Sequence, residues 1–436
     1  MVLFDWVSAA ARCTGITPSE LSNLEHADGH DVAGGSLTYE QISSPELQAA
    51  YGTVASAATE QANMGVVIAD VALIGYEDGN GDDDDDASMT DAGYESDAST
   101  TGSTSITPSI WDHSFENGRR YHKFHEGAYH FPNDDAEQER EDMKHSMVKM
   151  LCNDQLHFAP IGPSPQAILD IGTGTGSWAM EMGERYPSAS VLGVDLSPIQ
   201  PDWVPPNVRF MVDDVESPWL HPRDHFDYIH FRHTVMAIKD WDILLRRCYE
   251  HTKPGGWVEL QEIHHFPMSN NGNGNGSHAG GGMMPPDHPV AQYWRRIDEG
   301  LARLGVVGFG QRASEPWSES GSGSESTALE LLRGAGFVEA TGRRVFHIPI
   351  GPWPRNKVLK GVGVYWRTIL VDGLQATALR PLMRGLRWER ARVEAFLVAV
   401  RRAYLDLDLD DNEGSQMYMP LVCVYGQKPL NGRLLS

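Results

Sequence analysis

The residues best suited to chemistry are three glycines at alternate positions, Gly172, Gly174 and Gly176, directly after the apolar segment 167–171. Such a loop turns a buried strand into a helix and leaves bare backbone beside a ligand, since a side chain would fill the ligand's space. Thr173 lies between the first two glycines and belongs to the predicted contact. On its own, the loop favours ligand binding, with a purely structural turn between two elements as the alternative.

A carboxylate downstream of the glycine loop indicates that the loop binds a nucleoside. The apolar segment 190–194 ends in Asp195, which is followed by Leu196. This carboxylate lies about 20 residues after the loop, the offset at which an acidic side chain reaches ribose hydroxyls. The sequence therefore predicts a βαβ unit that binds a nucleoside, with Asp195 and Leu196 near the ribose.

The spacing of the loop selects among nucleoside cofactors. A dinucleotide fingerprint needs glycine at position 177, where this chain has Ser177, and no Gly-Lys-Ser/Thr sequence supplies a P-loop lysine. Asp170 would repel a pyrophosphate but suits the ammonium group of S-adenosylmethionine. These residues favour S-adenosylmethionine as the cofactor and disfavour a nicotinamide dehydrogenase.

The next strand supplies a candidate adenine contact. Segment 208–212 is followed by Asp213, Asp214 and Val215. One carboxylate at this position can accept the adenine amino hydrogens while the next backbone N–H meets a ring nitrogen. We expect Asp214 and Val215 to form this pair and Asp213 to cap the loop.

The elements that must position these residues alternate along the chain. Strands are expected at 167–171, 190–196, 209–212, 226–231, 257–263, 338–348 and 419–425, and helices at 137–152, 177–185, 241–251, 288–304, 328–334, 359–374 and 386–405. Alternation of this kind predicts an α/β fold with a mostly parallel sheet and helices on both faces. Ligands of such sheets bind beyond the carboxyl ends of the strands.

Composition divides the chain into two parts. The net charge is −25, yet residues 1–118 hold 21 acidic residues and one basic residue, so the rest carries only about −5. The run Asp82 to Asp86 lies among Gly, Ser and Thr, which favours a solvated linker over a docking segment for a basic partner. We expect 1–110 to be largely disordered and 111–436 to be one domain, with a nucleoside-binding core at 165–265, flexible insertions at 269–286 and 314–326, and C-terminal helices and strands at 328–430.

The cysteines and the distribution of apolar residues indicate the cellular compartment. The four cysteines are scattered without a CxxC pair, which supports neither a disulfide framework nor a zinc site. There is no basic leader and no apolar stretch long enough to span a bilayer. We expect an intracellular protein, cytoplasmic or nuclear, with no membrane or direct nucleic-acid contact and no metal.

Methyl transfer needs a general base only when the acceptor arrives protonated. Histidines after the fourth and fifth strands are candidates for this role, above all His233 and His265, although a structural or solvent-facing role is favoured for any one of them. Four aromatic residues are possible linings of an acceptor pocket, although helical spacing favours the core: Trp353, Tyr365, Trp366 and Trp388.

Several separate motifs resemble the fungal LaeA-like methyltransferases. They are the segments 118–122 and 127–134 with Glu137 and Arg140, the glycine loop, and the segments 348–354 and 425–429. The resemblance implies a seven-stranded, Rossmann-like class I fold that uses S-adenosylmethionine. It also implies that Tyr121, in an N-terminal lid, approaches the cofactor, and that velvet-type regulatory proteins are possible partners.

Two functions fit these residues. One is an enzyme that methylates an unknown small molecule or protein, linked to regulation or biosynthesis of secondary metabolites. The other is a cofactor-binding regulatory scaffold in a nuclear complex, with little or no methyl transfer of its own.

Overall fold

The computed structural model describes residues 112–269, 282–308, 324–405 and 416–430. The acidic segment predicted to be disordered, at 1–110, lies outside the described residues. So do the middle of the first predicted insertion and most of the second. All statements below concern the described residues.

One mixed sheet forms the centre of the fold, with the order β5-β4-β3-β6-β7-β11-β8-β9 and with β10 also paired to β11. Strands β3 to β7 are parallel, whereas β11 runs antiparallel to both β7 and β10. The long strands are β3 (Ala167–Ile171), β4 (Ser190–Asp195), β5 (Val208–Val212), β6 (Phe226–Arg232), β7 (Thr252–Ile263), β10 (Glu339–Pro349) and β11 (Met417–Gln427). Seven long strands, most of them parallel, thus form the body of this nine-stranded sheet, and the predicted fold class is confirmed.

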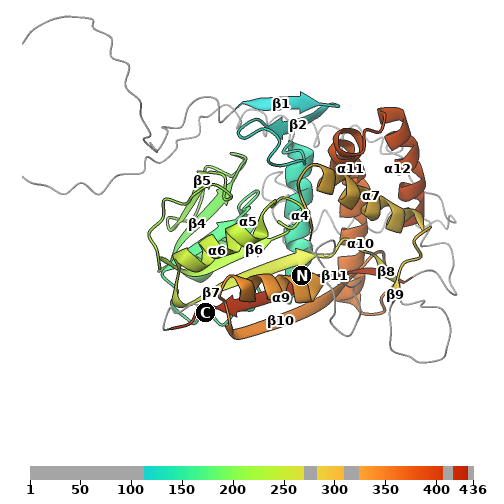
Figure 1. The fold of residues 1–436 in the computed structure, drawn as a ribbon. Helices are drawn as coiled ribbons and strands as arrows, with labels where there is room; N and C mark the ends of the chain where they lie inside the picture. The colour runs from blue at the N-terminus through green and yellow to red at the C-terminus, as the bar shows by residue number, and fades with distance from the viewer. Residues whose placement is uncertain (1–111, 270–281, 309–323, 406–415, 431–436) are drawn as a thin grey trace, which may run out of the picture. The chain divides into compact units, whose positions relative to one another are not determined.

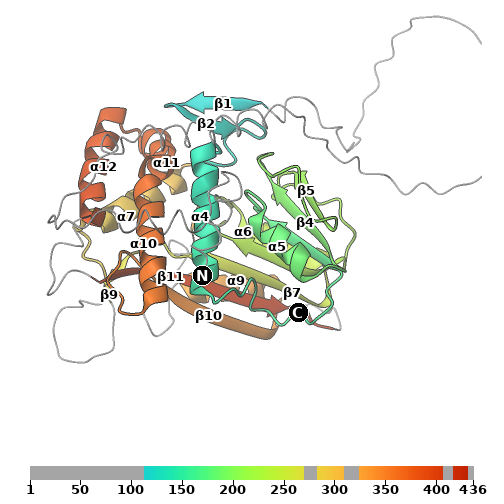
Figure 2. The same cartoon turned by 180° about the vertical axis from the view of Figure 1, so that it is seen from behind.

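Helices cover both faces of the sheet, as predicted. On one face α6 (Trp241–His251) and α9 (Ser324–Gly334) pack on β3, β6, β7 and β11 through Trp241, Leu244 and Leu332. On the other, α5 (Ser177–Arg185) packs through Trp178 and Met182. Figure 1 shows α6 and α9 in front of the sheet, and Figure 2, turned by 180°, shows α5 in front of it. The strands are buried on both faces, which explains their continuous apolar sequences.

The C-terminal helices form a group beside the sheet that we call the cap. It consists of α7 (Pro289–Arg303), α10 (Lys357–Asp372), α11 (Leu374–Arg380), the π-helical turn η3 (Pro381–Gly385) and α12 (Arg390–Leu405). The helix α4 (Asp135–Leu151) packs against α10 and shares its apolar core. This core holds the cap beside the strand edge where the ligand is expected.

Two local sequence signals define the cap. The Asn356 side chain accepts hydrogen bonds from the backbone N–H groups of Val358 and Leu359, which caps α10. A Cβ atom at Gly300 or Gly385 would overlap backbone of the facing segment, so glycine allows α7 and η3 to touch. The helix predicted over 386–405 instead begins at Arg390, because the chain first completes η3.

An unpredicted hairpin lies at the N-terminal end of the described chain. Strands β1 (His113–Glu116) and β2 (Arg119–His122) pair antiparallel around Asn117 and Gly118, whose φ angles are 55° and 82°. Asn-Gly with two positive φ angles is the signature of a tight hairpin turn. The sequence carried this signal, but four-residue strands in an aromatic, charged segment show little periodicity. The insertion predicted at 269–286 likewise begins and ends in short paired strands, β8 (Met268–Ser269) and β9 (Gly282–Met283).

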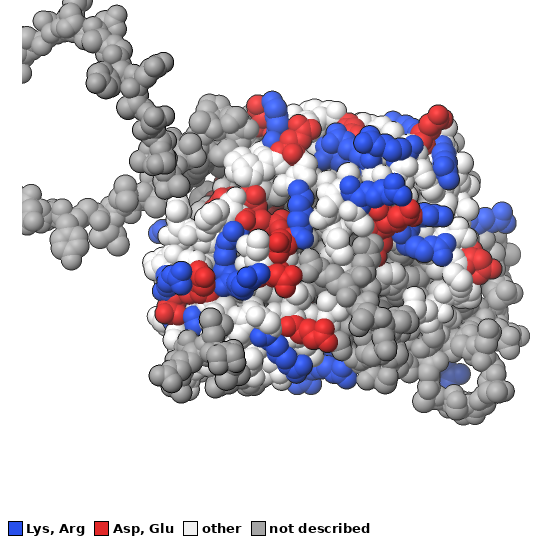
Figure 3. All heavy atoms as spheres, viewed as in Figure 1, with Lys and Arg blue, Asp and Glu red and all other residues white. Residues whose placement is uncertain are grey.

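Charge is spread over the body of the protein. Figure 3 shows basic and acidic side chains interspersed on one face, with more basic ones over the cap helices. Exposed arginines of this region include Arg387, Arg390 and Arg392. Within the described ranges, no helix is both long and apolar enough to cross a membrane.

Candidate functional site

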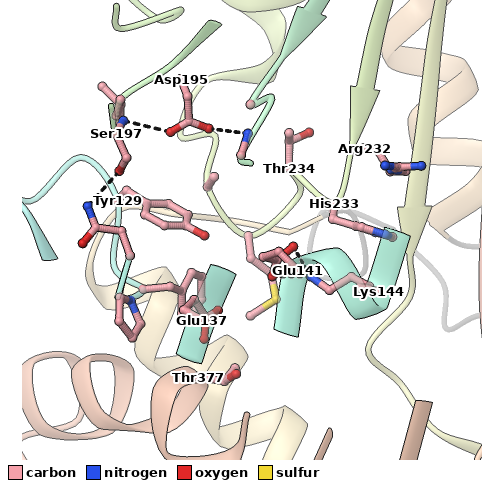
Figure 4. A pocket seen from close by; sticks show the side chains of 18 of the residues that line it. Tyr129, Glu137, Glu141, Lys144, Asp195, Ser197, Arg232, His233, Thr234 and Thr377 are labelled. Atoms are coloured by element: carbon pink, nitrogen blue, oxygen red, sulfur yellow. Dashed lines mark hydrogen bonds and ion pairs between the residues drawn. The ribbon is translucent and has the colours of Figure 1, made fainter. Parts of the chain in front are cut away.

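A cavity of about 190 Å³ lies where the carboxyl ends of β3, β4, β5 and β6 meet α4 and the cap. The segment 128–133, which follows the β1–β2 hairpin, forms a further wall. Figure 4 shows side chains from these separate elements directed toward one another around it. The location is the one expected for a ligand of an open α/β sheet.

The glycine loop borders this cavity with backbone that only glycine tolerates well. Gly172, Gly174 and Gly176 have φ angles of 69°, 57° and 83°. A Cβ atom at Gly176 would overlap the Phe210 ring, whereas one at Gly174 would meet no atom within 4 Å. Because Gly174 lines the cavity, its missing side chain leaves space that a ligand can occupy.

Asp170 holds the loop from beneath. Its Oδ1 pairs with His230 Nδ1 at 2.8 Å, and its Oδ2 accepts a hydrogen bond from the Thr173 hydroxyl at 2.6 Å. Asp170 and Thr173 do not line the main cavity but border a smaller hollow beneath the loop, which we call the loop recess. The predicted contact to an ammonium group would therefore take place in this recess.

Asp195 faces the main cavity, as predicted. Its two carboxylate oxygens accept hydrogen bonds from the backbone N–H groups of Gly174 and Ser197, both at 2.9 Å (Figure 4). Burial raises the pKa of Asp195 to about 6, while these hydrogen bonds act in the opposite direction. Leu196 lines the same wall. The carboxylate thus joins the glycine loop to the β4 end and retains accepting capacity for ribose hydroxyls.

The predicted adenine contacts also line the cavity. Asp213, Asp214 and Val215 lie together after β5. The Asp213 carboxylate accepts from the backbone N–H of Asp214 at 2.8 Å, which agrees with its predicted role as a loop cap. One oxygen of Asp214 accepts from the backbone N–H of Glu216, and the other lies 3.0 Å from His125 Nδ1. Asp214 therefore also ties the N-terminal segment to the β5 end.

Tyr121 does not reach the cavity. It is fully buried in β2, where the Arg380 guanidinium lies 3.4 Å from the centre of its ring. Tyr129, eight positions later, lines the cavity instead. The resemblance led us to expect Tyr121 near the cofactor, but the β1–β2 hairpin buries Tyr121 and leaves Tyr129 at the cavity.

The structure brings both candidate bases, His233 and His265, to the cavity wall. His233 has a left-handed backbone (φ 60°), and both its ring nitrogens are buried without a hydrogen-bond partner. Burial holds the pKa of His233 well below its ordinary value, so the ring is neutral. His265 stacks on Trp294 with ring centroids 4.4 Å apart, and burial lowers its pKa to about 3. A strained, neutral and unpartnered imidazole is typical of a functional position.

A ladder of charges on α4, missed by the sequence reasoning, forms another wall. Glu137 pairs with Arg140, and Glu141 pairs with both Arg140 (2.8 Å) and Lys144 (2.6 Å). These residues recur three and four positions apart, so they share one face of the helix. The spacing was visible in the sequence, but alternating charges normally mark a solvated face. Here the cap and the sheet edge bury that face.

The aromatic residues considered for an acceptor pocket separate in the structure. Trp366 lines the cavity, whereas the indole N–H of Trp353 donates to the backbone carbonyl of Met417. Tyr365 is 40 % exposed, and Arg392 lies over Trp388. The apolar wall instead combines residues of α7 and α10: Tyr293, Trp294, Trp366, Ile369 and Leu370.

Comparisons with known proteins agree with this geometry. The family model for a methyltransferase domain matches residues 143–297. A methyltransferase of Aspergillus terreus, pytC, is 37% identical over 327 residues, covering 75% of this chain and 91% of that protein. The secondary metabolism regulator LAE1 of Cochliobolus heterostrophus is 35% identical over 66% of this chain and 87% of its own length. The chain belongs to the LaeA-like family of fungal S-adenosylmethionine-dependent methyltransferases.

The LaeA-like chain has a site that fits S-adenosylmethionine. The glycine loop leaves space at Gly174, and Asp195 lies beside it with a carboxylate open to the cavity. Its predicted identity as a methyltransferase with this cofactor is confirmed. Among the described residues, no group of histidine, cysteine and acidic side chains is arranged to hold a metal ion.

Proposed function

We propose that this methyltransferase acts on a small, largely apolar acceptor that enters the cavity beside the cap. The observation that carries the proposal is the continuity of one cavity from Gly174 and Asp195 to the aromatic wall of α7 and α10. Concave sites with apolar walls and a few directed polar groups are typical of small-molecule binding.

The cofactor's nucleoside would lie at the ends of β4 and β5. Asp195 would accept hydrogen bonds from ribose hydroxyls, and Asp214 with the backbone of Val215 would contact the adenine edge. Gly172 and Gly174 would border the rest of the molecule with backbone alone. When bound, S-adenosylmethionine supplies an electrophilic methyl group on a sulfonium. The chain's part is then to align donor and acceptor and to exclude water.

The acceptor would lie against Trp366 and Leu370. His233 is the group that we propose to accept a proton from a hydroxyl acceptor, because its ring is neutral and its nitrogens lack partners. His265, stacked on Trp294, would shape the same wall. An acceptor that carries no acidic proton would need only the alignment.

Calorimetric titration of the purified chain tests cofactor use. We expect S-adenosylmethionine and S-adenosylhomocysteine to bind and NAD to give no heat of binding. Incubation with methyl-labelled donor and fungal extract, followed by separation of small molecules from protein, then tests the acceptor class. Label in a small molecule supports the proposal, and label confined to protein contradicts it.

A protein acceptor has a specific observation in its favour. A relative from Emericella nidulans, 30% identical over 69% of this chain and 75% of its own length, is named as a protein-methionine methyltransferase. The enclosed apolar wall nevertheless favours a small molecule, because a protein segment would have to enter as a single side chain. The labelling experiment separates the two.

A regulatory scaffold is the second candidate function, because relatives such as LAE1 are named as regulators of secondary metabolism. In that case the protein would act with velvet-type proteins in the nucleus rather than as an enzyme of biosynthesis in the cytoplasm. Co-purification of the tagged chain from nuclear and cytoplasmic fractions tests this. A scaffold would recover such partners from the nuclear fraction and label no acceptor, even with the cofactor bound.

A further inference from the structure

Arg232, the last residue of β6, lines both the main cavity and the loop recess. One of its N–H groups donates to His145 Nδ1 at 2.6 Å. Among the described residues, no carboxylate lies within ion-pair distance of it. Arg232 is therefore a partly buried cation at the site that forms no ion pair within the described residues, although Asp170 and Glu141 lie near enough to attract it.

The contact with His145 does not neutralise this charge. Nε2 of His145 lies 3.2 Å from a carboxylate oxygen of Glu181, so the ring proton belongs on Nε2, and Nδ1 is free to accept. Burial and the neighbouring Arg232 both hold the pKa of His145 below its ordinary value. A neutral His145 fixes the direction of the guanidinium but supplies no negative charge to pair with it.

The nearest carboxylates are engaged elsewhere. Glu141 pairs with Lys144 and Arg140, and Asp170 is held by His230 and Thr173. Burial lowers the pKa of Arg232, which is the physical signature of a cation removed from water. Removing a charge from water without a partner is costly, and an anionic ligand that binds there offsets the cost.

The strand order determines which end of a ligand Arg232 can meet. Strands β4 and β5 lie on one side of β3 and its glycine loop, and β6 lies on the other. In Figure 4, Asp195 and Arg232 accordingly appear on opposite sides of the site. A nucleoside bound by Asp195 thus has its substituent directed across the loop toward the end of β6.

We propose that Arg232 binds the α-carboxylate of the amino-acid end of S-adenosylmethionine, with His145 orienting the guanidinium. This inference rests on the proposed binding of the nucleoside at Asp195. The planar guanidinium offers paired N–H donors that match a carboxylate. Arg232 then selects ligands by their carboxylate, whereas Asp195 selects them by their ribose.

Calorimetric titration of the full chain with two ligands tests the proposal. S-adenosylhomocysteine carries the amino-acid end, and 5′-methylthioadenosine lacks it. For Arg232→Gln we expect the dissociation constant of S-adenosylhomocysteine to rise about 10- to 150-fold, as for a lost hydrogen bond to a charged group. The dissociation constant of 5′-methylthioadenosine should stay within about threefold, because this ligand makes no contact with Arg232.

Lys149→Gln is the matched control, since Lys149 also pairs with Glu181, at 2.7 Å, but does not line the cavity or the recess. It should leave both dissociation constants unchanged. Equal weakening of both ligands by Arg232→Gln would show that the arginine acts through the fold, and unchanged binding of S-adenosylhomocysteine would also overturn the proposal.

A measurement on the unaltered chain covers the case in which Arg232→Gln does not fold. Decarboxylated S-adenosylmethionine keeps the sulfonium and an amino group but lacks the carboxylate. We expect it to bind at least about tenfold more weakly than S-adenosylmethionine. Equal affinities would refute the role of Arg232 while leaving the cofactor assignment intact, whereas failure of both compounds to bind would refute the proposed function itself.

Discussion

The two halves of the site are built in opposite ways. The proposed nucleoside edge, formed by loop 172–176, Asp195 and 213–215, consists of short segments that each follow a strand or end it. The acceptor wall of Tyr293, Trp294, Trp366, Ile369 and Leu370 comes from cap helices far along the chain. One half is therefore set by strand ends, and the other by helix packing.

This difference extends to the chemistry. At the nucleoside edge the carboxylates are held by backbone N–H groups, as where Gly174 and Ser197 donate to Asp195. At the acceptor wall the side chains are mainly apolar, and the indole N–H of Trp366 is buried without a partner. In the proposed binding mode the first half would specify one ligand by hydrogen bonds, whereas the second would select by shape. Mutations in the two halves should separate cofactor binding from methyl transfer.

The largest expected effect is at the nucleoside edge. Asp195→Ala should raise the dissociation constant of S-adenosylhomocysteine about 10- to 150-fold, because hydrogen bonds to a charged group are lost. Calorimetry measures this, and the exposed Asp202→Ala serves as the control with unchanged affinity. A normal affinity for Asp195→Ala would contradict the assignment of the ribose.

A substitution in the acceptor wall should reduce methyl transfer and leave cofactor affinity nearly unchanged. Leu370→Phe extends into the cavity, so we expect methyl transfer to an extract acceptor to fall at least about tenfold by misplacement of the acceptor. The affinity for S-adenosylhomocysteine should stay within about threefold. Val364→Phe, on the exposed side of the same helix, is the matched control and should change neither value. If Leu370→Phe lost cofactor affinity while Val364→Phe kept it, the two halves would not control cofactor binding and methyl transfer separately.

Acid should weaken binding at the nucleoside edge. Burial raises the pKa of Asp195 to about 6. The protonated carboxyl therefore contributes to folding stability fully below the ordinary pKa of aspartate, and this contribution is lost as the pH rises through 6. The ionised form is the one that accepts ribose hydrogen bonds. Affinity for S-adenosylhomocysteine should therefore rise with pH through 6, with a difference of about tenfold between pH 5 and pH 7.5. In Asp195→Asn, titration calorimetry should find weaker and pH-independent binding, and a retained pH step would implicate another group.

A smaller effect is expected where the N-terminal segment meets the nucleoside edge. The His125–Asp214 contact is partly exposed, and such pairs contribute little. His125→Ala should weaken binding of S-adenosylhomocysteine by no more than about fivefold, and less in high salt. A larger, salt-independent loss in calorimetry would mean that His125 contacts the ligand itself.

The smallest effect is expected from removal of the acidic N-terminal segment. The lining residues of the site all lie at position 128 or beyond. Deletion of residues 1–105 should therefore leave the affinity for S-adenosylhomocysteine within a few-fold, as measured by titration. A large loss would show that the acidic segment packs on the catalytic domain.

Local sequence was sufficient wherever a strand end carries the function. Two loop glycines and four residues at strand ends reach the cavity, because successive parallel strands end at the same edge of the sheet: Gly172, Gly174, Asp195, Leu196, Asp214 and Val215. It was insufficient where a side chain's direction depends on packing. Tyr121 and Tyr129 share one aromatic segment, yet only the second lines the cavity.

The sequence by itself determined the α/β order of elements and the cofactor class, and it predicted the nucleoside edge, because strand periodicity and glycine conformation act over a few residues. Tertiary structure alone decided that the charged face of α4 is buried, that Arg232 forms no ion pair within the described residues and that α7 and α10 supply an apolar wall of the cavity. These features depend on contacts between segments distant in the chain. The free energy of burying a charge is set by the neighbours that folding brings to it, and local sequence does not specify them.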